Sequence, residues 1–211
     1  MGHGALAMLG ILKRIYGNLV KGRLGRLGAD QRGVAALEFA LIAPLLLSMY
    51  FLTMEVGQGI EANKKVGRAA SMVADLVTQQ QDTTKADLDA ILNIGSAILQ
   101  PYNRSKPTIT ITAIEVNNAG TPIVKWSRRL SNGAFSTGPA KDTSTTLPAA
   151  LSVAGSFLVR VEGSLTYYPV ITWAAGDKGT LGLTAAFDSL NMKETYYLRP
   201  RMTNAIGCDD C

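Results

Sequence analysis

Residues 34–56 read VAALEFALIAPLLLSMYFLTMEV, a predominantly apolar stretch of 23 residues. As an α-helix it would be about 34 Å long at 1.5 Å per residue, and the hydrocarbon core of a bilayer is about 30 Å thick. The stretch is longer than the apolar core of a secretory signal peptide, and no well-placed small-x-small cleavage site follows it. We therefore expect a transmembrane helix that stays in the mature protein.

The basic residues are concentrated before this stretch. Residues 1–33 hold six lysines and arginines against Asp30, a net charge of +5, whereas residues 34–211 hold 15 basic and 15 acidic residues. Because positive charge marks the cytoplasmic side of a membrane segment, we expect a cytoplasmic N-terminus and export of the chain after about residue 57. A basic cluster directly before an apolar stretch favours this topology signal over a nucleic-acid-binding face, so no nucleic-acid partner is predicted.

Side chains suited to catalysis are scarce. His3 is the only histidine, and Cys208 and Cys211 are the only cysteines. If the basic segment is removed, the mature chain has no histidine, which excludes Ser-His and Cys-His catalysis and most zinc sites. We predict a protein that is not an enzyme and uses no cofactor or metal. The two cysteines could form a redox dithiol, half of a metal site or a disulfide, and an oxidising destination favours the disulfide.

Glu38 places a carboxylate inside the apolar stretch. Such a charge costs about 2.5–3.5 kcal/mol near the bilayer centre and normally marks a functional position. Glu38 also lies only about 6 Å along the helix axis from Val34, so a headgroup-level position without special function fits equally well. The neighbouring sequence favours function, because Gly33 directly precedes the apolar stretch and Glu38 is the fifth residue after it.

This combination resembles the type IV prepilin processing site. The resemblance implies cleavage between Gly33 and Val34 by a membrane aspartic peptidase, with Val34 as the mature N-terminus. The run RGVAALEFALIAPLLL, residues 32–47, looks like the start of the TadE-like proteins, which are minor pilins or pseudopilins of tight-adherence (Flp) pilus systems. The run YLRPR at residues 197–201 and the late Cys208 are similar to the tail of that family but less specific.

The resemblance implies a structural role in pilus assembly, carried out by packing of the N-terminal helix. The implied partners are a prepilin peptidase, other pilins or pseudopilins, the inner-membrane pilus platform and the lipid bilayer. The implied location is the bacterial inner membrane, crossed once, with a periplasmic or extracellular C-terminal domain that could join the pilus. The pattern fits both the TadE and the TadF type. The alternative is an uncleaved, membrane-anchored envelope protein whose exported domain serves adhesion or scaffolding.

Helical periodicity continues beyond the apolar stretch. Val66, Ala70, Val73 and Val77 follow one another at spacings of 4, 3 and 4, which predicts an amphipathic continuation of the same helix. After a polar break at residues 79–83, Thr84 with an aspartate three residues later forms a capping box. A second helix is therefore expected, ending before the proline at position 101.

The periodicity changes to two after this helix. Residues 108–112 and 123–126 read as strands, and the turn-forming residues 117–120 between them predict a hairpin. Residues 157–167 alternate most clearly, and residues 193–198 are expected to form the last strand. Residues 130–148, rich in Ser, Thr, Gly and Pro, are expected to form a long surface loop.

These patterns divide the 211 residues into four parts. We expect a cleaved basic leader at residues 1–33, a transmembrane helix at 34–56, an amphipathic helical region at 57–100 and a β-rich exported domain at 101–211. The predicted fold is α+β and pilin-like: a long N-terminal transmembrane and amphipathic helix, a second helix, and an antiparallel sheet in meander order, with the helices on one face.

Overall fold

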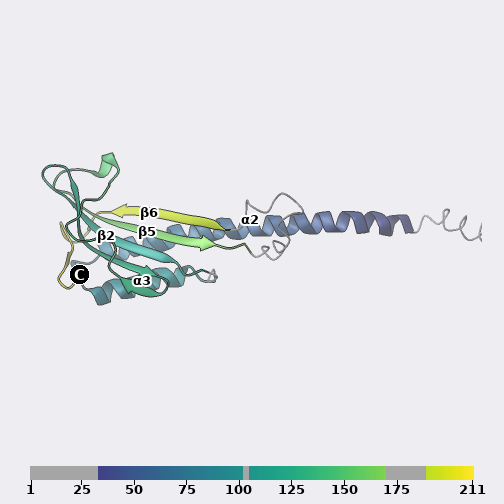
Figure 1. Cartoon of the computed structure of the whole chain (residues 1–211), viewed down its shortest axis with the longest axis horizontal. Coiled ribbons are helices and arrows are strands. Elements are labelled where there is room, and N and C mark those ends of the chain that lie inside the picture. Colours follow the sequence, from purple (N-terminus) through teal and green to yellow (C-terminus); the bar gives the residue numbers. More distant parts are fainter. Residues whose placement is uncertain (1–32, 102–104, 170–188) are drawn as a thin grey trace, which may run out of the picture. The chain divides into compact units, whose positions relative to one another are not determined.

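The computed structural model describes residues 33–101, 105–169 and 189–211. Most of the predicted leader lies outside these residues. The chain divides into two compact units, residues 1–52 and 53–211. The elements follow one another as α2 (Val34–Thr78), β1 (Asp82–Thr83), α3 (Lys85–Ile98), β2 (Thr108–Val116), β3 (Pro122–Ser131), β4 (Ala134–Ser136), the short 3₁₀ helix η2 (Ala149–Leu151), β5 (Phe157–Tyr167), β6 (Leu190–Leu198) and β7 (Gly207–Cys208) (Figure 1). The predicted α+β fold is confirmed.

Helix α2 changes character along its length. Its large apolar side chains between residues 34 and 54 are all exposed. From Gly59 onward a single buried stripe follows the helix, and the four residues predicted for that stripe are at most 1% exposed. Alanines and valines recur on one side of the helix and form this stripe. Because the stripe is apolar, it packs against the sheet. The expected continuation of the apolar helix as an amphipathic one is confirmed.

Helix α3 begins at the predicted capping box. The Thr84 side chain accepts a hydrogen bond from the backbone N–H of Asp87, and the Asp87 carboxylate accepts one from the backbone N–H of Thr84. These bonds satisfy backbone donors that the first helical turn leaves free. The helix ends at Ile98, as expected, before the proline.

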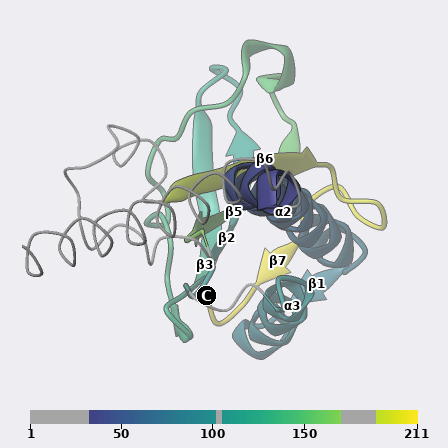
Figure 2. The same ribbon diagram turned by 90° about the vertical axis from the view of Figure 1, so that its right-hand side faces the viewer.

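The larger sheet has the strand order β4-β3-β2-β5-β6, and each neighbouring pair is antiparallel. The predicted hairpin is β2 with β3. A simple meander is wrong, however, because β5 pairs with the free edge of β2 instead of with β4 (Figure 2). The reason is burial: β2 and the first half of β5 are buried on both faces and need central positions, whereas the three residues of β4 are all exposed.

The prediction of a loop across residues 130–148 is wrong in part. Residues 130 and 131 belong to β3, and residues 134–136 form β4. Further on, the N–H of Val124 donates to the Thr143 carbonyl at 2.9 Å, and the N–H of Asp142 donates to the Val124 carbonyl at 2.8 Å. Residues 142 and 143 therefore provide hydrogen-bond partners for backbone groups on the outer edge of β3. Polar sequences are common in such edge segments, and they show little of the apolar periodicity that predicts a strand.

A second correction concerns the C-terminus. The strand expected at residues 193–198 begins earlier, at Leu190, and it is not the last. Strand β7 follows and pairs in parallel with β1, Asp82 opposite Gly207 and Thr83 opposite Cys208. Strands of two residues have no periodicity to detect, so the sequence gives no sign of this pairing.

Helices α2 and α3 pack on the same face of the sheet (Figure 2). Gly95 of α3 lies in this contact: a Cβ atom there would be 2.5 Å from Val73 Cγ2 on α2 and 3.1 Å from Ile109 Cδ1 on β2. A glycine is therefore required at the point where both helices and the sheet meet.

Replacing Gly95 by alanine is expected to destabilise the protein. Helix propensity alone would stabilise the variant by about 1 kcal/mol, but overpacking of a filled core costs about 1–3 kcal/mol. Denaturant unfolding followed by circular dichroism should show a lower free energy of unfolding for Gly95→Ala, whereas Asn93→Ala on the exposed face of α3 should not lower it. Adding Val73→Ala removes the clashing methyl, so the double variant should lose less than the two single losses together. Equal stabilities for Gly95→Ala and Asn93→Ala would contradict the clash.

Candidate functional site: the apolar helix and its junction with the sheet

The predicted processing residues lie at the beginning of α2. Gly33 is exposed, and a Cβ atom built on it meets nothing within 4 Å. Val34 is the first residue of α2 and is 49% exposed. Glu38 is also exposed and lies one turn later, on the face of the helix that Val34 occupies. Among the described residues, all three of these positions are therefore exposed.

The helix surface that follows is apolar on all sides. Among its exposed side chains, Phe39 and Leu41 are 70% and 72% exposed. Soluble monomers rarely expose apolar patches of more than a few hundred Å². Within the described residues, α2 is the one helix long and apolar enough to cross a membrane, judged by length and composition. This surface is compatible with a single-pass membrane anchor.

The junction between the apolar stretch and the sheet is formed by Glu55. Its carboxylate accepts a hydrogen bond of 2.6 Å from the Tyr167 hydroxyl at the end of β5. The Tyr167 ring is buried and lies over Gly59, where a Cβ atom would be 3.9 Å from Tyr167 Cε1. Glu55 is not among the predicted site residues. The sequence feature that could have indicated Glu55 is its position, as a second carboxylate, in the last turn of the apolar stretch.

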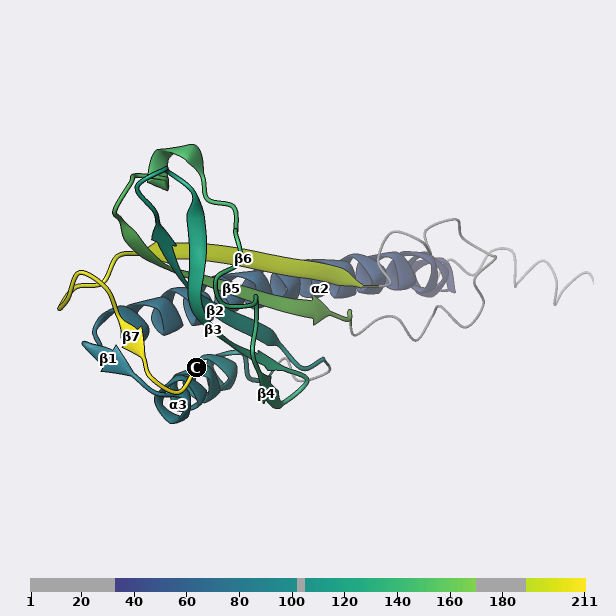
Figure 3. The same ribbon diagram turned by 60° about the vertical axis from the view of Figure 1, so that its left-hand side comes forward.

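The chain from residue 201 to residue 211, here called the C-terminal clasp, joins the end of α2 to the start of α3. The Arg201 N–H donates to the Thr78 carbonyl at 2.9 Å, and the Arg201 guanidinium lies 2.5 Å from Asp75. Further along, the Lys85 N–H donates to the Asp210 carboxylate at 2.9 Å. The clasp therefore fixes both helix ends through backbone groups and charges (Figure 3).

The two cysteines lie at the end of the clasp. Cys208 and Cys211 form a disulfide with their Cα atoms 5.5 Å apart. Together with Asp210 they form a group whose ligand atoms are close enough to hold a metal ion. A metal would need thiolates, which a disulfide does not offer. The arrangement therefore favours a structural crosslink over a metal or redox site.

Two ion pairs join neighbouring elements of the domain. Arg128 on β3 donates two hydrogen bonds of 2.7 Å to the Asp89 carboxylate on α3. These bonds raise the pKa of Arg128. On the neighbouring strands, the hydrogen bond to Glu115 raises the pKa of Lys125, whose Nζ lies 2.8 Å from that carboxylate. Both pairs stabilise the charged forms and are suited to packing rather than to proton transfer.

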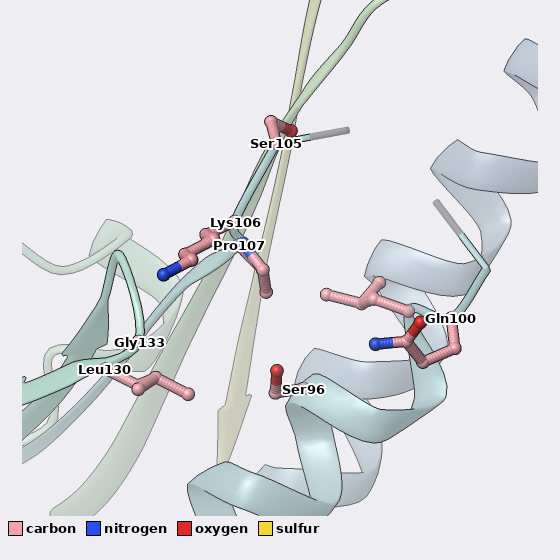
Figure 4. A pocket seen from close by; sticks show the side chains of 8 residues that line it. Ser96, Gln100, Ser105, Lys106, Pro107, Leu130 and Gly133 are labelled. Atoms are coloured by element: carbon pink, nitrogen blue, oxygen red, sulfur yellow. The ribbon is translucent and has the colours of Figure 1, made fainter. Parts of the chain in front are cut away.

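A cavity of about 280 Å³ lies between the end of α3 and the start of β2 (Figure 4). Its lining residues are Ser96, Leu99, Gln100, Ser105, Lys106, Pro107, Leu130 and Gly133. The polar groups around it serve the fold: Ser105 Oγ donates to the Thr166 carbonyl and Lys106 Nζ to the Asn132 carbonyl. None of the predicted site residues lines this cavity.

Comparison with known families identifies the N-terminal segment. A family model of TadE-like proteins matches residues 33–75. The protein carries a TadE-like segment. The predicted resemblance to TadE-like proteins is thereby confirmed for residues 33–75, and the match ends before α3 and the sheet. A search of curated proteins and a search of solved structures each found no match.

A TadE-like segment implies involvement in a tight-adherence pilus system, with other components of that system as partners. The matched segment begins at Gly33 and contains the exposed apolar surface of residues 34–54 and the buried stripe as far as Ala74. The TadE-like match and the candidate site therefore coincide on one helix.

Proposed function

We propose that the protein is a minor pilin or pseudopilin that takes part in tight-adherence pilus biogenesis, is processed after Gly33 and assembles through its N-terminal helix. The observation that carries the proposal is the apolar surface of residues 34–54, exposed on all sides and starting immediately after Gly33. The TadE-like match that begins at the same glycine supports it.

The mechanism has two steps. Before cleavage, the apolar surface anchors the protein in the inner membrane, with the basic leader on the cytoplasmic side and the domain exported. A prepilin peptidase then cuts the bond after Gly33 and removes the leader. Helix packing follows, because the same surface, freed of its basic leader, can exchange lipid contacts for contacts with other pilins or with the platform proteins.

In this proposal the domain that follows the apolar stretch is a rigid structural domain that enters the assembly together with the helix. Its two helices are fixed to the sheet by a filled core, by the Arg128 pair with Asp89 and by the C-terminal clasp. Export places the clasp in an oxidising compartment, where a disulfide between Cys208 and Cys211 persists.

Cleavage after Gly33 is the expected result when the protein is extracted from membranes of its own host. Intact-mass measurement should give a chain that begins at Val34. Gly33→Leu should retain the leader because a bulky side chain replaces the residue before the cut. Gly57→Leu, at a glycine inside α2 where a Cβ atom also meets nothing within 4 Å, should be processed normally. A wild-type chain that still begins at Met1 would instead support the uncleaved envelope anchor.

A further inference from the structure

The end of the sheet that adjoins the apolar stretch carries three exposed apolar side chains. Ile60 of α2 is 54% exposed, Leu190 at the start of β6 is 41% exposed, and Tyr168 directly after β5 is 44% exposed. We call these three residues the proximal rim. All three belong to the unit formed by residues 53–211.

The level of the rim along α2 follows from contacts within that unit. Tyr167 bonds to Glu55 and lies over Gly59, and Leu190 is the register partner of Tyr167 across β5 and β6. The ends of both strands therefore lie beside residues 55–59 of α2, and the two strands run along that helix (Figure 1, Figure 3). These residues are the last turn of the predicted membrane stretch and the turn after it.

This placement determines what surrounds the rim when the protein is anchored. If the bilayer encloses α2 up to residue 56, side chains at the level of residues 55–60 lie at the headgroup boundary. Tyrosine and aliphatic residues are favoured at that depth, because an apolar body can enter the acyl region while a polar group stays hydrated. Lys64, exposed one turn beyond Ile60, is placed to extend its amine toward lipid phosphates.

The position of the rim also explains how Glu55 can lie at the end of the predicted membrane stretch. A carboxylate in the last turn of a membrane helix is costly without a partner. The Tyr167 hydroxyl supplies one, at 2.6 Å, from the same strand end that presents Tyr168. One corner of the sheet thus gives Glu55 a hydrogen-bond partner and presents apolar side chains to its surroundings.

We propose that the proximal rim is a lipid-contacting surface, so that the exported domain rests on the outer leaflet of the inner membrane at Ile60, Tyr168 and Leu190. Its occupant is lipid rather than another protein, because the rim lies beside residues 55–59 of α2, where the predicted membrane stretch ends. This proposal rests on the proposed membrane anchoring. The domain would be released from the leaflet only when the helix is extracted into an assembly.

The test uses the full-length protein in vesicles of phosphatidylethanolamine and phosphatidylglycerol. Nitroxide labels are attached to the single variants Ile60→Cys, Tyr168→Cys and Leu190→Cys, and their collision rates with oxygen and with a water-soluble nickel complex are compared. Leu45→Cys reports the membrane stretch. Val153→Cys is the matched control: this residue is 52% exposed but lies before the start of β5, at the other end of the sheet.

Labels on the rim are expected between the phosphate level and about 5–10 Å inside it, as for interfacial helices, while the label at 153 remains in water. The chain without an added cysteine corrects for labelling of the native pair. Lipid at 45 combined with water at all three rim positions would overturn the rim proposal alone. Water at 45 as well would overturn membrane anchoring and the rim together.

Discussion

Replacing Glu38 by glutamine is expected to leave the protein membrane-inserted and its domain folded, but to remove it from pilus complexes. The reason begins with the charge: a carboxylate beside lipid is unfavourable and gains from an opposite charge. Cleavage after Gly33 creates such a charge, the α-amine of Val34, one helical turn away. The neutral glutamine keeps the size of the side chain and loses only the attraction.

Pairing between subunits would make this attraction an assembly signal. Helices that pack with a small axial offset bring the amine of one subunit to the Glu38 of the next, and only certain offsets satisfy both charges. Removing one partner of a buried ion pair costs about 3–5 kcal/mol, because the other charge is left without compensation. Since 1.4 kcal/mol corresponds to a factor of about ten in affinity, co-assembly should fall at least tenfold.

Co-purification of the processed variant with pilus components measures this loss, and protease resistance of the domain reports its folding. Glu61→Gln is the matched control, since Glu61 is an exposed acid of the same helix beyond the apolar stretch, paired with Lys65 at 3.4 Å. Normal co-assembly of Glu38→Gln would refute the pairing. Loss of the variant from the membrane would show a role in stability instead.

Replacing Ile206, in the C-terminal clasp, by alanine is expected to lower the thermal stability of the domain strongly. This side chain is 1% exposed and belongs to the main core, and its carbonyl accepts a hydrogen bond of 2.8 Å from Trp126 Nε1. Ile206→Ala leaves a cavity between the sheet and the helices, which costs about 2–5 kcal/mol. For a chain of this size we expect the Tm of the domain to fall by roughly 5–15 °C.

Thermal unfolding of the full-length protein in detergent, followed by near-ultraviolet circular dichroism, measures the change. Met202→Ala is the control within the clasp, because Met202 is 61% exposed and fills no cavity. The two variants should therefore differ clearly in Tm. If Ile206→Ala were as stable as Met202→Ala, the clasp would not belong to the folded core.

The helices and the central strands were predictable from local patterns. The stripe from Val66 to Val77 repeats at helical spacing, Thr84 begins a capping box, and residues 157–167 alternate with a period of two. The processing residues Gly33, Val34 and Glu38 were also proposed from the sequence, on the basis of their distance from the start of the apolar stretch. Each of these signals involves residues close together along the chain.

The sequence by itself determined the apolar helix and the α+β class, since both follow from composition and short-range periodicity. Only the tertiary structure decided the pairing of β5 with β2, the pairing of the two-residue strands β1 and β7, and the bond between Tyr167 and Glu55. These contacts join segments far apart in the chain, and 112 residues separate Glu55 from its partner. Such pairings depend on which surfaces remain free once the core has formed, and no local pattern encodes that.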